Sequence, residues 1–324
     1  MEAAVGDALR VVACAAKPSL VAPSAWRRLV ETGDRIPLTS GGGIECRPDD
    51  PDCADLAVRF MSTEAATETL LDPPLAVAGE AGPGLAGLGR HWLREAGRPS
   101  GPRMLWLELD LRAGSPPIPS VFAGPGNPPR GRPVGLPDDD EWAAIISLLR
   151  PDPPVSGAAR LFSVLPRGAW VGYIGIMRGR ELRATVSGLK PEEVPGLLRR
   201  LAWSGEPAAL DPVLGVACAH SARITLGLDL NDGIGRALGV ELAPFGPDCW
   251  EELLDAATAV APISSLARSA LLAWPGENIA DSNWPDRLRT RAGRIVRRLN
   301  HLKFGVDGAS RPPLKAYLYF GLID

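Results

Sequence analysis

Apolar residues alternate strictly with charged or aromatic ones in several segments of the chain. In residues 105–112, Leu-Trp-Leu-Glu-Leu-Asp-Leu-Arg, every second position is leucine. Residues 223–230 and 314–320 repeat the pattern, with Arg, Thr, Asp, Lys and Tyr among the polar positions. Successive side chains of a strand point to opposite faces of its sheet. We therefore expect strands with one aliphatic face, covered by helices, and one polar face in contact with water.

Helices and strand pairs follow one another in about five units. The similar segments LAWSGE at 201–206 and LAWPGE at 272–277 support this division into repeated units. Period-two segments predict strands, and apolar spacing of three and four residues predicts helices. The expected helices span 1–33, 62–69, 85–96, 140–149, 191–202 and two segments after Cys249. The expected strands span 44–46, 56–60, 104–112, 120–123, 170–177, 181–188, a hairpin over 223–242, 301–307 and 314–322.

The number of strands predicts how they assemble. An antiparallel sheet of about ten strands tends to curl, and closing it removes its exposed edges. We therefore expect an α+β fold with a single domain over residues 1–324. It would be an antiparallel β-barrel of about ten strands with helices outside, built from five α(α)ββ units, and its lumen could hold a ligand cavity. Residues 113–140 are rich in proline and glycine, which predicts a long loop or lid.

Composition narrows the class of protein. The net charge of −3 over 324 residues gives no basic excess, so we expect no nucleic-acid partner. No apolar run has the length of a membrane span and the start lacks a positively charged signal region, so we expect no membrane partner and a cytoplasmic location. The five cysteines are an odd number, which favours reduced thiols. The three histidines are far apart, which argues against a transition-metal site.

The polar strand face supplies the residues that would line a closed barrel. The inward set is Glu45, Arg47, Asp55, Arg59, Trp106, Glu108, Asp110, Arg112, Arg183, Thr185, Arg223, Thr225, Asp229, Glu241, His301, Lys303, Lys315, Tyr317 and Tyr319.

Four members of this set are candidates for chemistry. Glu108 and Asp110 lie two residues apart on one face, as a general base requires, or they neutralise a basic lumen. Trp106 on the same face would stack on an acceptor ring or a cation, or cap the end of the barrel. His301 lies in register beside Lys303, where it would transfer a proton or make a structural hydrogen bond.

Three segments stand out in the predicted order of elements: Leu228-Asp229-Leu230, the Lys303 strand, and Leu314-Lys315-Ala316-Tyr317-Leu318-Tyr319. With these segments and this order of elements, the chain resembles the ABBA prenyltransferases. Their antiparallel barrel consists of five α-α-β-β units around a polar lumen, and the resemblance covers nearly the whole chain. In that family, inward Lys and Arg bind the isoprenoid diphosphate and tyrosines shield the allylic cation. Carried over by position, the resemblance gives the diphosphate role to Arg59, Arg183, Arg223, Lys303 and Lys315, and the shielding role to Tyr173, Tyr317 and Tyr319.

This resemblance implies transfer of an isoprenoid group from an allylic diphosphate to an aromatic small molecule or a peptide side chain. Fixed cations would stabilise the charge that grows on the diphosphate as the allylic bond breaks. The alternative is that the same cations pair with acidic residues on neighbouring strands. Two other functions stay open: a barrel that binds a peptide or metabolite without chemistry, and a cyclase or lyase that acts on a modified peptide.

No cofactor follows from the sequence, apart from Mg²⁺ as a companion of a diphosphate substrate. The acidic run Asp138-Asp139-Asp140-Glu141 is similar to the magnesium motif of helical prenyl synthases. We interpret it instead as the start of a helix, where acidic side chains favour the positive end of the helix dipole. Its carboxylates would also suit Mg²⁺ at the mouth of the barrel.

Overall fold

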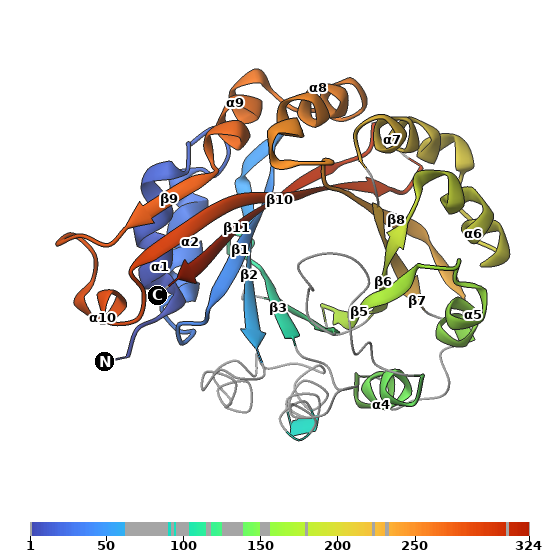
Figure 1. Cartoon of the computed structure of the whole chain (residues 1–324), viewed down its shortest axis with the longest axis horizontal. Helices are drawn as coiled ribbons and strands as arrows, with labels where there is room; N and C mark the ends of the chain where they lie inside the picture. Colours follow the sequence, from blue (N-terminus) through green and yellow to red (C-terminus); the bar gives the residue numbers. More distant parts are fainter. Residues whose placement is uncertain are drawn as a thin grey trace.

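Ten antiparallel strands close into a barrel in the described part of the computed structural model (Figure 1). They are β1 (Gly41–Arg47), β2 (Asp50–Met61), β3 (Met104–Asp110), β4 (Ile118–Gly124), β5 (Trp170–Met177), β6 (Glu181–Leu189), β7 (Ile224–Leu230), β8 (Ile234–Leu242), β10 (Arg294–Val306) and β11 (Leu314–Ile323). Neighbours in sequence pair from β1 to β8, β8 pairs with β10, and β11 pairs with both β10 and β1. The predicted antiparallel barrel is confirmed.

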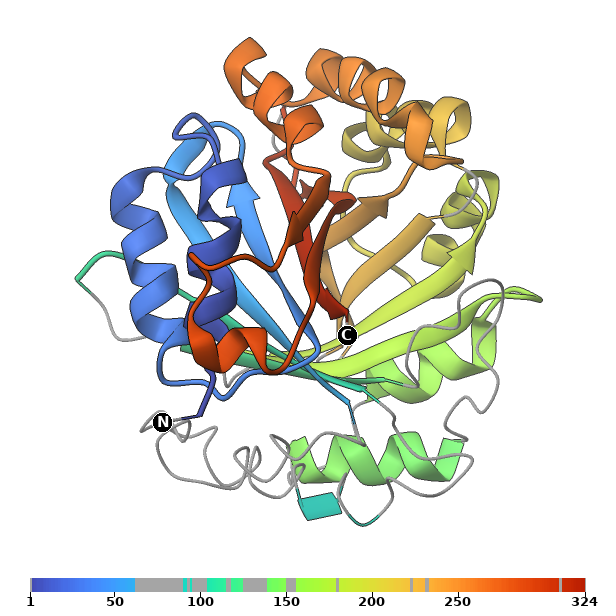
Figure 2. The same cartoon turned by 60° about the vertical axis from the view of Figure 1, so that its left-hand side comes forward.

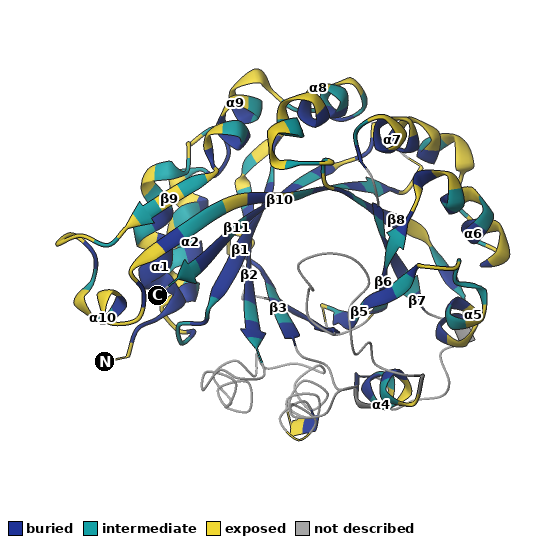
Figure 3. Ribbon diagram, in the orientation of Figure 1, coloured by how far each residue is buried: buried dark blue, intermediate teal, exposed yellow. Residues whose placement is uncertain are grey.

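Helices surround the ring on its outer side (Figures 1 and 2). They are α1 (Val5–Val12), α2 (Pro23–Gly33), α4 (Asp139–Leu149), α5 (Ser156–Val164), α6 (Val194–Arg200), α7 (Pro207–His220), α8 (Trp250–Val260), α9 (Ser265–Ala273) and α10 (Asp286–Arg289). Their exposed residues face outward and their buried residues face the strands (Figure 3). None of the described helices is long and apolar enough to cross a membrane.

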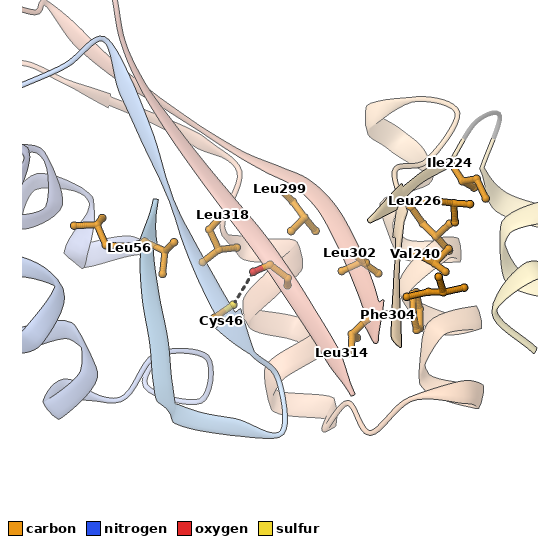
Figure 4. Close-up of a cluster of buried hydrophobic side chains, with 14 of the residues drawn as sticks. Cys46, Leu56, Ile224, Leu226, Val240, Leu299, Leu302, Phe304, Leu314 and Leu318 are labelled. Atoms are coloured by element: carbon orange, nitrogen blue, oxygen red, sulfur yellow. Dashed lines mark hydrogen bonds between the residues drawn. The ribbon is translucent and has the colours of Figure 1, made fainter. Parts of the chain in front are cut away.

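The core lies between the strands and these helices. Leu302 and Phe304 of β10 and Val240 of β8 have no more than traces of exposed surface, and Figure 4 shows them beside Leu226 of β7. They alternate with the polar residues that face the lumen, as the period of two requires. Burial of each such side chain contributes about 2 kcal/mol, so this aliphatic layer fixes the register and thereby the direction of every lumen residue.

The structure describes residues 2–61, 90–91, 94, 104–114, 118–124, 139–149, 156–178, 181–221, 224–230, 233–308 and 311–323. The expected helix 62–69, most of 85–96 and most of the expected loop 113–140 lie outside these ranges. Within 113–140, residues 118–124 form β4, in agreement with the shorter strand expected at 120–123. The expectation of a loop throughout 113–140 was therefore wrong for this strand, whose proline, Pro119, lies near its first residue.

Several other boundaries differ from the predicted ones. The expected helix 1–33 is two helices, α1 and α2, and α2 has Pro23 in its first turn. Helices α5 and α7 were not predicted, and α7 contains Pro212 and has no marked apolar stripe that a sequence pattern could reveal. Strand β10 begins at Arg294 rather than His301, and its first residues also pair with a short strand outside the ring, β9 (Gly276–Ile279).

Candidate functional site

The barrel encloses a cavity of about 280 Å³. Its wall comes from strands all around the ring, because every strand turns alternate side chains inward. The lining residues are Gly43, Ala57, Trp106, Glu108, Phe122, Tyr173, Arg183, Thr185, Ser187, Thr225, Glu241, Ala243, Asn300, His301, Lys303, Tyr317, Leu318 and Tyr319. Of the sequence-predicted site residues, the structure thus brings together Trp106, Glu108, Tyr173, Arg183, His301, Lys303, Tyr317 and Tyr319.

The two lysines of the site lie on adjacent strands and each holds a carboxylate. The Nζ atom of Lys303 lies 2.9 Å from Oε1 of Glu241, and that of Lys315 lies 2.5 Å from Oε1 of Glu45. Burial is the largest single effect on Glu45 and would raise its pKa, but the Lys315 ammonium, the Tyr317 hydroxyl and Arg47 together lower that pKa to about 2. Burial likewise opposes ionisation of Glu241, and Lys303 holds its pKa below the ordinary value. Both carboxylates are therefore ionised at neutral pH.

The two arginines of the site differ from each other. Arg183 of β6 donates from Nε to Oδ1 of Asp229 on β7, at 2.7 Å. Arg59 of β2 donates from Nη2 to the hydroxyl of Ser40 at 2.9 Å, and its guanidinium carbon lies 5.5 Å from the ring centre of Tyr319. Within the described chain, the buried Nε of Arg59 has no hydrogen-bond partner, and no carboxylate pairs with this residue. Of the two described arginines of the predicted site, Arg183 is thus paired with a carboxylate and Arg59 is not.

Tyr317 is the centre of an aromatic and polar cluster. Its ring stacks on His301 with centroids 4.1 Å apart, and Nζ of Lys303 lies 5.8 Å from its centroid. Its hydroxyl donates a short hydrogen bond to Glu45. Burial and the neighbouring carboxylates raise the pKa of Tyr317 well above its usual range, and burial lowers the pKa of His301. The tyrosine is therefore a neutral donor and the histidine a neutral ring at physiological pH.

Strands β3 to β5 supply the aromatic residues elsewhere on the ring. The hydroxyl of Tyr173 lies 3.5 Å from the sulfur of Met104 and accepts a hydrogen bond from Trp106. Burial raises the pKa of Tyr173 to about 12, so it stays protonated. Phe122 of β4 completes this aromatic side of the cavity.

Glu108 is the carboxyl group of the cavity wall that stays without a direct partner in the described residues. Burial raises its pKa to about 7, and the charge on Glu45 adds to the effect, while Lys303 and Lys315 act in the opposite direction. No described residue forms a hydrogen bond or ion pair with it. Glu108 can therefore exchange a proton near neutral pH.

Comparisons with known proteins agree with this geometry at the level of the fold. No protein-family model and no curated protein sequence matches the chain. Solved structures do match. The 5-dimethylallyltryptophan synthase from Streptomyces coelicolor superposes with a TM-score of 0.55 at 16% identity, over 98% of this chain and 95% of that chain. The 6-dimethylallyltryptophan synthase from Micromonospora olivasterospora, in complex with DMASPP and Trp, gives 0.57 at 12% identity, over 97% and 95%.

A third solved structure adds a further ligand pair. Prenyltransferase PriB, in a ternary complex with L-tryptophan and dimethylallyl thiolodiphosphate, gives a TM-score of 0.54 at 13% identity, over 98% of this chain and 94% of that chain. The chain has the ABBA prenyltransferase fold. At such identities the similarity concerns the fold, so the roles of residues in this ABBA barrel must come from its own geometry.

Three predicted site residues of the ABBA barrel do not line its cavity. Asp110 lies at the end of β3 and forms a short ion pair with Arg178, about 7 Å along the strand from Glu108. Of the two candidates for a general base, only Glu108 therefore lines the cavity, and Asp110 neutralises a basic side chain. Lys315 is instead paired with Glu45, and Arg59 lies over the ring of Tyr319, which does line the cavity. Arg223 lies outside the described residues, and its role stays a prediction.

The sequence reasoning missed several lining residues as site candidates. Thr185 was expected to face inward but was given no role, although its buried Oγ1 has no hydrogen-bond partner in the described structure. Glu241 was expected only as a partner of the basic residues and not as a site residue of its own. Asn300 lines the cavity because a register irregularity between Leu299 and His301 turns it inward, and period-two alternation cannot reveal such an irregularity.

A metal site is not evident in the described part of the ABBA barrel, where no group of three or more His, Cys, Asp or Glu side chains has a suitable arrangement. Helix α4 begins at Asp139, in agreement with the helix-start interpretation of the acidic run. Glu141 of this run lies with Oε1 2.9 Å from Nε2 of His91. Asp138 lies outside the described residues.

Proposed function

We propose that this barrel transfers an isoprenoid group from an allylic diphosphate to an aromatic acceptor. The observation that carries the proposal is the convergence of Arg183, Lys303, Tyr317 and the titratable Glu108 on one cavity. The names of two solved structures with this fold support it, because those proteins bind DMASPP or dimethylallyl thiolodiphosphate together with tryptophan. A cavity of about 280 Å³ is small for a ligand pocket and favours a five-carbon donor with a single-ring or indole acceptor.

The basic residues would hold the diphosphate. As the bond between the allylic carbon and the diphosphate oxygen breaks, negative charge grows on the leaving group, and fixed cations in a water-poor site stabilise it. Arg183 and Lys303 line the cavity, and Arg59 has an uncompensated guanidinium close by. Charge-assisted hydrogen bonds from these groups would bind the diphosphate before and after the bond breaks.

The aromatic residues would protect the allylic cation. The faces of tyrosine and tryptophan rings attract a cation through their quadrupole. They also keep water away from the allylic cation, and water would otherwise react with it. Tyr317 and Tyr319 come from β11, and Tyr173 and Trp106 come from β5 and β3. All four line the cavity, so a cation formed there would be shielded from more than one side.

Glu108 would accept the proton that the acceptor ring loses. The acceptor carbon forms a bond to the allylic carbon, the diphosphate departs with the electron pair of the broken bond, and a proton leaves the ring to restore aromaticity. Glu108 is ionised in part at neutral pH and has no described partner, so its carboxylate can take that proton. His301, with an unpartnered Nε2 in the described residues, is a second group that could relay it.

Incubation with dimethylallyl diphosphate and tryptophan, followed by mass spectrometry, tests the proposal. We expect a product heavier by one dimethylallyl group and release of diphosphate, with less or no product from geranyl and farnesyl diphosphates. Absence of a prenylated product with tryptophan, other indoles and tyrosine peptides, together with no binding of dimethylallyl thiolodiphosphate, would refute it.

A second candidate is a barrel that binds a small molecule or peptide without chemistry. The ion pairs of Lys303, Lys315 and Arg183 favour it, because they leave the lumen less positive than a diphosphate site requires. The two functions differ in one observation: the second gives a saturable complex with dimethylallyl thiolodiphosphate or an acceptor but no product under any condition.

A further inference from the structure

Two like charges lie side by side in the lumen. Lys315 of β11 is the register partner of Lys303 of β10, and Lys303 is in turn the register partner of Glu241 of β8. Like charges at directly opposite positions destabilise a sheet. In this barrel Glu241 takes up the charge of Lys303 and Glu45 takes up that of Lys315. Both ammonium groups thus already have carboxylate partners, with which the oxygens of a bound diphosphate would compete.

We propose that Glu241 exchanges its partner when a diphosphate binds. It pairs with Lys303 in the free barrel and moves to His301 when the diphosphate takes its place at Lys303. It returns to Lys303 as the product diphosphate leaves. The inference rests on the proposed function and adds to it a residue that sets affinity for the leaving group. No covalent bond changes in the exchange, since the ion pair of Lys303 with the diphosphate replaces its ion pair with Glu241.

The surroundings of Glu241 provide the second position. Its Oε2 atom lies 3.8 Å from Nε2 of His301, too far for a hydrogen bond, and that buried nitrogen has no other partner in the described structure. A rotation of the glutamate side chain by less than 1 Å at its oxygen would close this gap. The freed carboxylate would then be satisfied rather than left buried and unpaired, which would be costly.

Lys303 can make its part of the exchange without a change in the backbone. Its Cε atom lies over Gly239, only 2.7 Å from the place where a Cβ would stand, so the stem runs flat along the barrel wall. Its ammonium lies near the ring of Tyr317, and both residues line the cavity. Rotation about the last bonds of the side chain would turn the ammonium from Glu241 to a ligand in the lumen.

Arg183 and Glu108 are the other charged groups near the exchange. Arg183 of β6 attracts Glu241, and Glu108 of β3 lies close enough to Lys303 to affect its charge. Arg183 is held by Asp229, and Glu108 lies on β3, which pairs with neither β8 nor β10. The exchange therefore concerns one carboxylate with two alternative partners.

Titration calorimetry with inorganic pyrophosphate and with dimethylallyl thiolodiphosphate tests the proposal. Glu241→Gln keeps the shape but removes the competing charge, so we expect both probes to bind about tenfold tighter or more than to the wild type. We also expect stronger inhibition by pyrophosphate during turnover. Glu277→Gln, which removes the partner of Arg294 on the outer surface, is the matched control and should bind as the wild type does.

His301→Phe separates exchange from a merely structural role of Glu241. Phenylalanine keeps the stack on Tyr317 but removes the second partner, so this change should weaken pyrophosphate binding in the wild-type background and have little effect in the Glu241→Gln background. A stability change alone would not produce this coupling. The rise of the melting temperature on addition of pyrophosphate, measured for each variant, gives the same comparison if a variant is less stable.

The outcomes distinguish the two proposals. If the wild type binds dimethylallyl thiolodiphosphate and Glu241→Gln binds it equally well or more weakly, the exchange is wrong and the prenyltransferase proposal is unaffected. If Glu241→Gln is tighter but His301→Phe acts equally in both backgrounds, the move to His301 is wrong. If neither protein binds either probe, the proposed function fails, and the exchange fails with it.

Discussion

Glu108 combines burial with the lack of a described partner, and this makes it the most informative single residue. A base with a pKa of about 7 is half ionised at neutral pH, so the fraction of active enzyme should rise with pH through this value. We expect kcat/KM to increase up to about pH 8 and then to level off until another group titrates. Glu108→Gln should lower kcat by about 10²-fold to 10⁴-fold and abolish this limb of the profile.

The measurement is a pH profile of initial rates for both proteins with dimethylallyl diphosphate and the best acceptor. A matched control is Glu277→Gln, which removes a carboxylate outside the lumen and should keep the profile of the wild type. A Glu108→Gln protein that retains full activity with an unchanged profile would assign the base to another residue.

The same residue should affect stability, with a definite sign. The pKa of Glu108 rises from 4.5 in a free chain to about 7 in the fold, so the folded protein binds more protons than the unfolded one between these values. Stability from this group is therefore lost as pH increases from about 4.5 to 7. Glu108→Gln escapes the loss, and at pH 8 it should gain on the order of 3 kcal/mol relative to its difference at pH 4.

Urea unfolding at pH 4 and pH 8 measures this difference, with Glu277→Gln as the control that shows no such trend. Comparison of differences between proteins at each pH removes the contributions of all other groups. A constant difference between Glu108→Gln and the wild type over this range would show that the Glu108 pKa is not raised.

At the scale of strands, a row of glycines supports the lysine of the site. Gly227 of β7, Gly239 of β8 and Gly305 of β10 are register partners across three strands. A Cβ on Gly239 would stand 2.7 Å from Cε of Lys303, whereas a Cβ on Gly227 would meet nothing closer than 3.8 Å. Gly239→Ala should therefore displace the lysine and weaken pyrophosphate binding about tenfold, while Gly227→Ala should have little effect.

Calorimetry with pyrophosphate on the two alanine variants tests this prediction, and each variant is the control for the other. Both substitutions add one methyl group to the same face of neighbouring strands, so general effects on the sheet cancel. Equal affinities of Gly239→Ala and the wild type would show that Lys303 is not needed in its present position.

The strands also show what the sequence could reveal and what it could not. Alternation in residues 105–112 correctly predicted that Trp106 and Glu108 share a face, and the same rule oriented Lys303 and Tyr317. This works because a strand has an invariant period of two. The inward turn of Asn300 depends on an irregularity in β10, which leaves no mark on composition.

The sequence was even less informative about which acidic residue pairs with which lysine. The pairing of Lys303 with Glu241 depends on the register of β10 against β8, two strands from different units that lie far apart in the chain. Alternation tells which face a side chain is on and says nothing about its height along the barrel. The sequence could therefore predict that cations of the lumen pair with acidic residues of neighbouring strands, but not that Lys303 would pair with Glu241 and Lys315 with Glu45.

At the scale of the whole molecule, β11 joins the two ends of the chain's sheet. It pairs with β1 on one side and β10 on the other, so the ring closes only when the last strand is in place. Closure reduces the contact of the lumen side chains with bulk water, and a partner of opposite charge then offsets the loss of solvation of each charge. The ion pairs of the lumen are thus a consequence of the closed ring, and a diphosphate, if it binds there as we propose, competes with them.

In the outer layer of helices, an ion pair likewise joins segments from the two ends of the chain, α1 and α10. Asp7 of α1 is almost fully buried, with its side chain 2% exposed. It accepts hydrogen bonds from the backbone N–H of Ala4 and from Arg287 of α10, at 2.9 and 2.8 Å. The side chain of Arg287 is one-third exposed and stays solvated when its partner is removed, so the main loss in Asp7→Ala is of the two hydrogen bonds to the buried carboxylate, and we expect it to cost about 2 kcal/mol in unfolding free energy.

Asp286→Ala is the matched control, because Asp286 pairs with Arg289 on the same short helix but is 89% exposed, and an exposed pair contributes at most about 1 kcal/mol. Chemical denaturation of both variants measures the difference. Since Asp7 and Arg287 lie outside the lumen, Asp7→Ala should keep the pyrophosphate affinity of the wild type wherever it remains folded. Equal unfolding free energies for the two variants would show that the buried contacts of Asp7 do not stabilise the fold.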